Sequence, residues 1–88
     1  MQITEPGPAG PIKIVLTPRY SGQGNFLGTK VVLSEAGKVL VETTRFNLDQ
    51  PPTIVAEAIN RARDLFLSQD QSAYVEPLER ILRRASAR

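Results

Sequence analysis

Two apolar stretches flank a short glycine-containing turn, and this arrangement constrains the fold more than any other feature of the sequence. Residues 26–34 and 38–46 are rich in valine, leucine, threonine and phenylalanine, and they flank Glu35, Ala36 and Gly37. A short connection with glycine between such stretches predicts a β-hairpin. Gly37 suits the left-handed residue of a three-residue loop, because it has no Cβ to clash at positive φ.

The three-residue loop fixes a predicted register for this hairpin. Opposite charges directly across a ladder contribute roughly 0.2–1 kcal/mol, and a one-residue slip would move both charges to the other face. The register is therefore supported by the charge pair among the predicted partners, which are Leu33 with Val39, Val31 with Val41, Thr29 with Thr43, Val32 with Leu40, Lys30 with Glu42, and Phe26 with Phe46.

Side chains alternate across a strand, so the hairpin has two faces of different character. The face predicted to pack on the core holds Leu27, Thr29, Val31, Leu33, Val39, Val41 and Thr43. The second face is mixed and holds Phe26, Lys30, Val32, Leu40, Glu42, Thr44 and Phe46. It is either an exposed contact surface or a second small core beneath the C-terminal helix or the N-terminal arm.

The segment before the hairpin predicts an arm and one more strand. Residues 6–11 contain three prolines and two glycines, which is typical of a flexible or polyproline-like arm over residues 1–11. Residues 12–17 alternate in the manner of a strand that ends at Pro18. A loop with glycines follows over residues 19–25.

The segment after the hairpin predicts two helices. The first begins near Pro51 or Pro52, with Asp49 or Thr53 as its N-cap. Glu57 and Arg61 are spaced for an ion pair on its polar side, and its apolar stripe consists of Val55, Ala58, Ile59, Ala62, Leu65 and Phe66. The second helix begins near Pro77, or at Ala73 with a distorted start, and its apolar side consists of Tyr74, Leu78, Ile81, Leu82 and Ala85.

Strands followed by helices predict an α+β fold in the order β-β-β-α-α. We expect a three-stranded antiparallel meander, an amphipathic helix packed on one face, and a short C-terminal helix. The 88 residues allow one domain. We assign residues 1–11 to the flexible arm and residues 12–88 to a single small domain.

The composition removes the usual catalytic and metal-binding groups. The chain has no cysteine and no histidine, so it lacks the commonest general base and the commonest transition-metal ligands. The glycines at 22, 24 and 28 do not match the dinucleotide fingerprint. We expect a non-enzymatic protein without cofactor or metal. No apolar run reaches bilayer length and no signal peptide is visible, which predicts a cytoplasmic protein. The general style of the sequence suggests a bacterial or phage origin.

Basic residues suggest a contact with nucleic acid or with an acidic protein surface. The net charge is only +2, which is a weak bias. The candidates for this contact are Arg19, Tyr20, Arg80, Arg83, Arg84 and Arg88. The candidates for a protein contact lie on the second face of the hairpin and are Phe26, Lys30, Val32, Leu40, Glu42 and Phe46.

Residues 27–66 complete a β-β-β-α order that resembles the arm-type DNA-binding domain of phage-type integrases and the plant AP2 domain. The resemblance implies an exposed sheet face in the DNA major groove. Here that face departs from the basic pattern of those domains, because Lys30 lies beside Glu42, Val32 and Leu40.

The same size and element order also resemble small phage-encoded inhibitors of bacterial defence systems, the anti-CRISPR class among them. That resemblance implies a protein that covers a surface of its target. The sequence therefore predicts a small protein-binding module, with a nucleic-acid-binding domain or a bacterial homodimeric domain as the alternatives.

Overall fold

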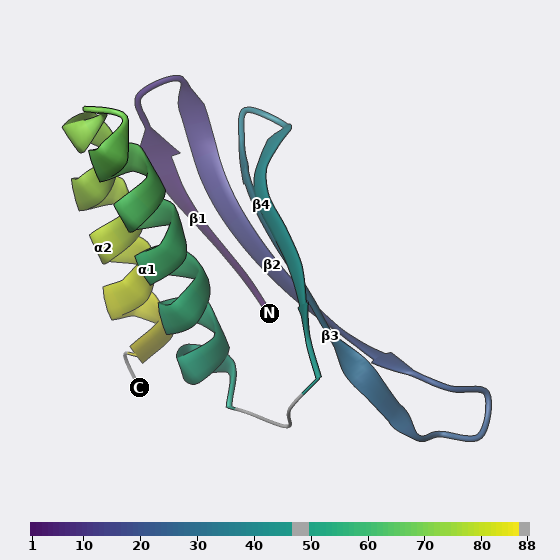
Figure 1. Ribbon diagram of the computed structural model, residues 1–88. Helices are drawn as coiled ribbons and strands as arrows, with labels where there is room; N and C mark the ends of the chain where they lie inside the picture. The colour runs from purple at the N-terminus through teal and green to yellow at the C-terminus, as the bar shows by residue number, and fades with distance from the viewer. Residues whose placement is uncertain (47–49, 87–88) are drawn as a thin grey trace.

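The structure is a computed structural model that describes residues 1–46 and 50–86 of the chain (Figure 1). It confirms an α+β fold with an antiparallel sheet followed by two helices, and it has four strands rather than three. The elements are β1 (Gln2–Gly7), β2 (Gly10–Tyr20), β3 (Phe26–Glu35), β4 (Lys38–Arg45), α1 (Pro51–Ser68), a 3-10 turn η1 (Ser72–Tyr74) and α2 (Val75–Ser86).

The flexible arm predicted for residues 1–11 is wrong, because this segment forms β1 and the start of β2. β1 pairs antiparallel with β2, and Ile3 is buried in the core. Pro6 lies opposite Pro11 near the turn that joins the two strands. Proline cannot donate a ladder hydrogen bond, and it is tolerated on an edge strand such as β1.

The four strands form a meander in the order β1-β2-β3-β4, and both helices cover one face of it (Figure 1). We call this face the inner face and the opposite face the outer face. The core lies between the inner face and the helices. Its largest fully buried side chains are Ile12, Ile14, Val31, Leu33, Val55, Ile59, Leu78 and Ile81.

The hairpin is present, but its predicted register is wrong. Ala36 and Gly37 have φ of 50° and 84°, so the turn has two residues of the left-handed kind that a tight hairpin favours. Leu40 is an extra residue on β4, because the register shifts there. The observed partners are Leu33 with Val41, Val32 with Glu42, Val31 with Thr43, Lys30 with Thr44, and Thr29 with Arg45.

The offset of two residues preserves most of the predicted faces. Thr29, Val31 and Leu33 are buried on the inner face as predicted. Leu27 and Val39 were predicted to face the core, but they are 55% and 50% exposed. A register shift beside Leu27 and the extra residue at Leu40 interrupt the simple alternation at both places.

Two residues predicted on the second face lie instead on the inner face. Leu40 packs against the core. Phe26 lines an apolar pocket together with Leu16 and Ile54, which are both core residues. By alternation, the outer face of this hairpin keeps Lys30, Val32, Glu42 and Thr44, with Phe46 just beyond the end of β4.

Helix α1 follows its predicted stripe closely. Pro51 and Pro52 open it, and Gln50 occupies the N-cap position without a side-chain cap hydrogen bond. The alternative start at Thr53 is therefore wrong, and Asp49 lies outside the described residues. Leu65 was predicted in the stripe but is 46% exposed. The buried residues are Ile54, Val55, Ala58, Ile59, Ala62 and Phe66.

Helix α2 begins at Val75, directly after η1, and Pro77 lies in its first turn as predicted. Its buried residues are Pro77, Leu78, Ile81 and Ala85. It packs against α1 and against β1, so the first strand and the last helix are in contact. Neither helix within residues 50–86 combines the length and the apolar character that a membrane span requires.

Candidate functional site

Two of the arginines at the C-terminal end of the chain bind the first strand. The Arg84 Nη1 atom lies 2.6 Å from Glu5 Oε2, and the Arg80 Nε atom lies 3.1 Å from Glu5 Oε1. The Glu5 side chain is only 14% exposed. The hydrogen bond from Arg84 lowers the pKa of Glu5, and Arg80 adds to this, while burial acts in the opposite direction.

The same two arginines also close the free edge of β1. Arg84 donates to the carbonyl oxygen of Thr4 at 2.6 Å, and Arg80 donates to that of Pro6 at 3.2 Å. Within the described residues, β1 pairs only with β2. Met1 bonds to Leu16 of β2 through its carbonyl, so by alternation the carbonyl groups of Thr4 and Pro6 point away from the sheet. An edge strand with unpaired carbonyls is a template for another chain. The arginines therefore occupy two of the carbonyl groups that an added strand would need at this side.

Two of the four arginines in the predicted basic cluster at the C-terminal end are thus engaged by other side chains of the protein. Arg80 and Arg84 are engaged by Glu5, and Arg80 also lies 3.0 Å from Glu76. Arg83 is exposed and has no ion pair within the described part of the chain. Arg88 lies outside the described residues.

The other predicted nucleic-acid residues lie at the far end of the β2–β3 hairpin. This hairpin extends beyond the helices (Figure 1). The Tyr20 ring packs edge-on against Phe26, with 5.9 Å between their centroids. Arg19 is exposed beside it, whereas the C-terminal arginines bind Glu5, whose partner on β2 is Ile12. The structure does not bring the two predicted basic groups into one strip.

The outer face holds four of the six predicted protein-binding residues and is uncovered by the described elements. Lys30 and Glu42 form an ion pair at 3.1 Å, although they are diagonal neighbours rather than direct partners. Other strands contribute mainly polar side chains to this face, among them Thr4, Lys13 and Thr17. A polar outer face is usual for an antiparallel sheet with helices on one side.

The free edge of β4 is open, in contrast to that of β1. β4 pairs only with β3. A Cβ on Gly28 would lie 3.0 Å from the Arg45 carbonyl oxygen, so this carbonyl points toward β3. Because backbone groups alternate along an antiparallel pair, the N–H and C=O groups of Glu42 and Thr44 point outward. Within residues 1–46 and 50–86, no backbone hydrogen bond outside the β3–β4 ladder involves them.

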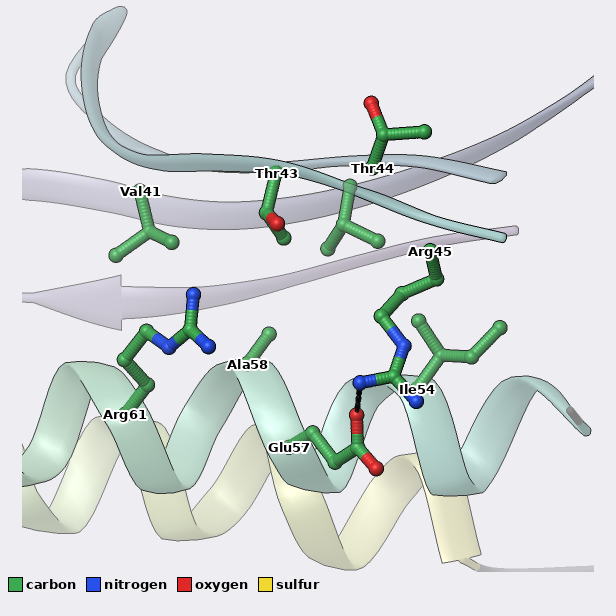
Figure 2. A pocket seen from close by; sticks show the side chains of 9 residues that line it. Val41, Thr43, Thr44, Arg45, Ile54, Glu57, Ala58 and Arg61 are labelled. Atoms are coloured by element: carbon green, nitrogen blue, oxygen red, sulfur yellow. Dashed lines mark ion pairs between the residues drawn. The ribbon is translucent and has the colours of Figure 1, made fainter. Parts of the chain in front are cut away.

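A groove lies beside this edge, between β4 and α1 (Figure 2). Its volume is about 190 Å³. Val41 and Thr43 point into it from the strand, while Thr44 points away (Figure 2). Its lining residues are Val31, Val41, Thr43, Thr44, Arg45, Ile54, Glu57, Ala58 and Arg61. Helix α1 packs over β3 and β4, and the groove opens between this helix and the edge strand.

Of the three charged residues that line the groove, two form an ion pair with each other. Arg45 forms an ion pair with Glu57 that closes one end of the groove (Figure 2). The predicted ion pair between Glu57 and Arg61 is wrong, since Glu57 turns to Arg45 instead. Arg61 reaches from α1 toward Val41 (Figure 2). No ion pair of Arg61 is found within residues 1–46 and 50–86, and the acidic residue of the groove, Glu57, is paired with Arg45.

Sequence reasoning missed both the β4 edge and the groove. One signal for the edge was present: residues 38–45 contain neither proline nor glycine, whereas residues 2–11 contain three prolines. Proline is a common device against pairing at an edge. The groove itself depends on where α1 packs, and no local pattern in the sequence reports that.

Among the described residues, the buried carboxylate of Glu35 makes hydrogen bonds that hold the fold together. Glu35 is 7% exposed, and it accepts a hydrogen bond from the Tyr74 hydroxyl at 2.6 Å and one from the Ala9 N–H at 3.1 Å. Among the described residues no three acidic, histidine or cysteine side chains gather as metal ligands would.

Comparison of the chain with protein-family models, with curated proteins and with solved structures gives no significant match.

Proposed function

We propose that this protein is a protein-binding module that takes an extended segment of its partner as a fifth strand along β4. The observation that carries the proposal is the contrast between the two edges. Arg80 and Arg84 cap the outward carbonyls of β1, whereas β4 leaves its outward groups without a partner strand and has a groove beside them.

An added strand would be held by the same kind of backbone hydrogen bonds that join the strands of the sheet. The outward N–H and C=O groups of Glu42 and Thr44 offer four backbone hydrogen bonds, each with a net contribution of about 0.5–1.5 kcal/mol. Alternate side chains of the added segment would face the groove, where Val41 and Thr43 lie. Backbone bonds then supply affinity and the groove supplies specificity.

The contact need not involve the polar outer face, which the sequence analysis proposed as the surface for a protein contact. It also needs no basic patch, and two of the candidate arginines are already bound by Glu5. An inhibitor that covers a target surface would be one protein of this binding class. Nucleic-acid binding through Arg19 and Lys30 remains the alternative hypothesis, and it predicts a steep dependence of affinity on salt.

The experiment is a selection of random decapeptides on the immobilised protein, followed by NMR of the 15N-labelled protein with an enriched peptide. We expect the amides of Glu42 and Thr44 to shift and to become protected from exchange. Failure to enrich any peptide, or shifts centred on Lys13 and Lys30 of the outer face, would contradict strand addition.

A pair of proline variants sharpens the test. Thr44→Pro removes an outward N–H from the β4 edge and should weaken peptide binding at least tenfold. Thr4→Pro makes the same change on the β1 edge, which the arginines close, and should leave peptide binding unchanged. If the enriched peptides bind both variants equally well, β4 is not the binding edge.

A further inference from the structure

We infer that the segment added along β4 carries an acidic side chain that binds Arg61. This inference rests on the proposed function and names the chemistry of the partner. It starts from Arg61 on α1, the basic side chain of the groove that forms no ion pair within residues 1–46 and 50–86.

The position of Arg61 suits a side chain of the added strand. Arg61 reaches upward from α1 while Val41 and Thr43 point down from β4, so the three side chains converge on the groove (Figure 2). An inward-facing residue of a strand beside Val41 and Thr43 would enter the same space. The Thr43 hydroxyl can donate a further hydrogen bond to a carboxylate there.

The charges around the groove favour a carboxylate as the occupant. Its ionisable lining residues are Arg45, Glu57 and Arg61, and the single acid among them is already bound by Arg45. Asp64 follows one turn later on α1 but does not line the groove. The lining therefore carries a net positive charge, and a planar guanidinium matches a carboxylate with two parallel hydrogen bonds.

The test uses three octapeptides, in which threonine alternates with inward-facing residues. They have the sequence Lys-Thr-Val-Thr-Xaa-Thr-Val-Thr, with glutamate, glutamine or lysine at Xaa. NMR titration of the 15N-labelled protein reports both the affinity and the place of binding. We expect the glutamate peptide to bind about tenfold more tightly than the glutamine peptide, and the lysine peptide to bind most weakly.

Two charge-reversal variants separate Arg61 from the overall charge of the protein. Arg61→Glu should invert the order of the peptides, and Arg61→Gln should remove the preference. Arg83→Glu makes the same change in net charge at an exposed site on α2 and should preserve the preference. A preference that Arg83→Glu abolishes equally would overturn the assignment to Arg61.

The outcomes also distinguish this inference from the function on which it rests. If all three peptides bind equally and still shift the amides of Glu42 and Thr44, strand addition stands and the acidic preference is wrong. If neither these peptides nor any selected decapeptide binds at β4, the proposed function itself is wrong.

Discussion

At the scale of single residues, two partly buried hydrogen bonds to Glu35 join three segments that are distant in sequence. Glu35 at the end of β3 accepts from Tyr74 of η1 and from Ala9 in the β1–β2 turn. The Tyr74 ring stacks on Phe66 of α1, with 4.0 Å between their centroids. The Glu35 carboxylate raises the pKa of Tyr74, because it accepts the hydroxyl proton and would repel a phenolate.

The loss of this hydroxyl should be measurable. Tyr74→Phe keeps the stacked ring but removes a hydrogen bond to a carboxylate, so the free energy of unfolding should fall by about 1–2 kcal/mol in urea titrations. Tyr20→Phe is the matched control, since Tyr20 is 60% exposed, and it should change stability by less than about 0.5 kcal/mol. Equal losses in the two variants would contradict a special role for the Glu35 contact.

The pH dependence of the same pair follows from the raised pKa of Tyr74. A group with a raised folded pKa stabilises the protein fully below its unfolded pKa, which is about 10 for tyrosine. The stabilisation is lost as the pH rises through the higher folded value. The difference in stability between the unmodified protein and Tyr74→Phe should therefore be constant from pH 7 to 9 and shrink above pH ~10.

The pKa of Glu5 is shifted in the opposite direction to that of Tyr74, so its effect on stability has the opposite pH dependence. Its pKa is lowered by Arg84 and Arg80, so its stabilising effect is present above the ordinary glutamate pKa of about 4.3. The effect disappears as the pH falls through the lower folded value. Glu5→Gln should lower the urea midpoint at pH 7, and this difference should vanish in acid.

A matched control for Glu5 is available on the same arginine. Glu76 lies 3.0 Å from Arg80, but its side chain is 80% exposed. Exposed ion pairs contribute little to stability, so Glu76→Gln should leave the urea midpoint almost unchanged at pH 7. A larger effect for Glu76→Gln than for Glu5→Gln would show that Glu5 does not hold β1 to α2.

At the scale of secondary-structure elements, the sequence predicted those elements whose signals are local. The apolar spacing of residues 55–66 placed α1 correctly, and Pro77 placed the start of α2 within two residues. The hairpin was also predictable from its glycine turn. Its register was not, because the choice between a two-residue and a three-residue turn depends on the extra residue at Leu40.

The missed elements depend on distant contacts. β1 has a proline at position 6 and only one buried apolar side chain, Ile3, so local patterns favour an arm. It is held by β2 and by two arginines that lie more than 70 residues later. The groove beside β4 likewise follows from the packing of α1, and it appears only when the sheet and the helix are assembled.

The irregular end of β3 offers a test at this scale. Gly28 has φ of +144°, and a Cβ there would lie 3.0 Å from the Arg45 carbonyl oxygen and 3.1 Å from Thr44 Cγ2. Gly28→Ala should therefore reduce the free energy of unfolding by about 1–3 kcal/mol, because of backbone strain and crowding.

Gly22 provides the control for this substitution in the same hairpin. No atom lies within 4 Å of a Cβ at Gly22, and its φ is not positive. Gly22→Ala should be neutral or stabilising by up to about 1 kcal/mol, because it reduces the freedom of the unfolded chain. Similar losses for both alanine variants, measured by urea denaturation, would show that β3 does not need glycine at position 28.

At the scale of the whole molecule, the shape is elongated for a chain of this length. The radius of gyration is 13.4 Å, whereas about 12 Å is typical for 88 residues. The β2–β3 hairpin accounts for this, because it extends beyond the helices (Figure 1). Tyr20 and Leu27 are more than half exposed on it. The compact part of the molecule is thus small, and its stability depends on closing the N-terminal strand against the C-terminal helix.

The contribution of β1 to stability can be tested by changing its buried residue or by removing the strand. Ile3 is 6% exposed among core residues from both helices, so Ile3→Ala should reduce the free energy of unfolding by about 2–4 kcal/mol. Because domains of this kind have only about 5–15 kcal/mol in total, removal of residues 1–9 should abolish the cooperative thermal transition seen by circular dichroism. Gln2→Ala changes an exposed side chain of the same strand and should be silent. If the shortened chain still melted cooperatively at the same temperature, residues 1–9 would behave as the flexible arm that their prolines suggest, and β1 would not be part of the folding unit.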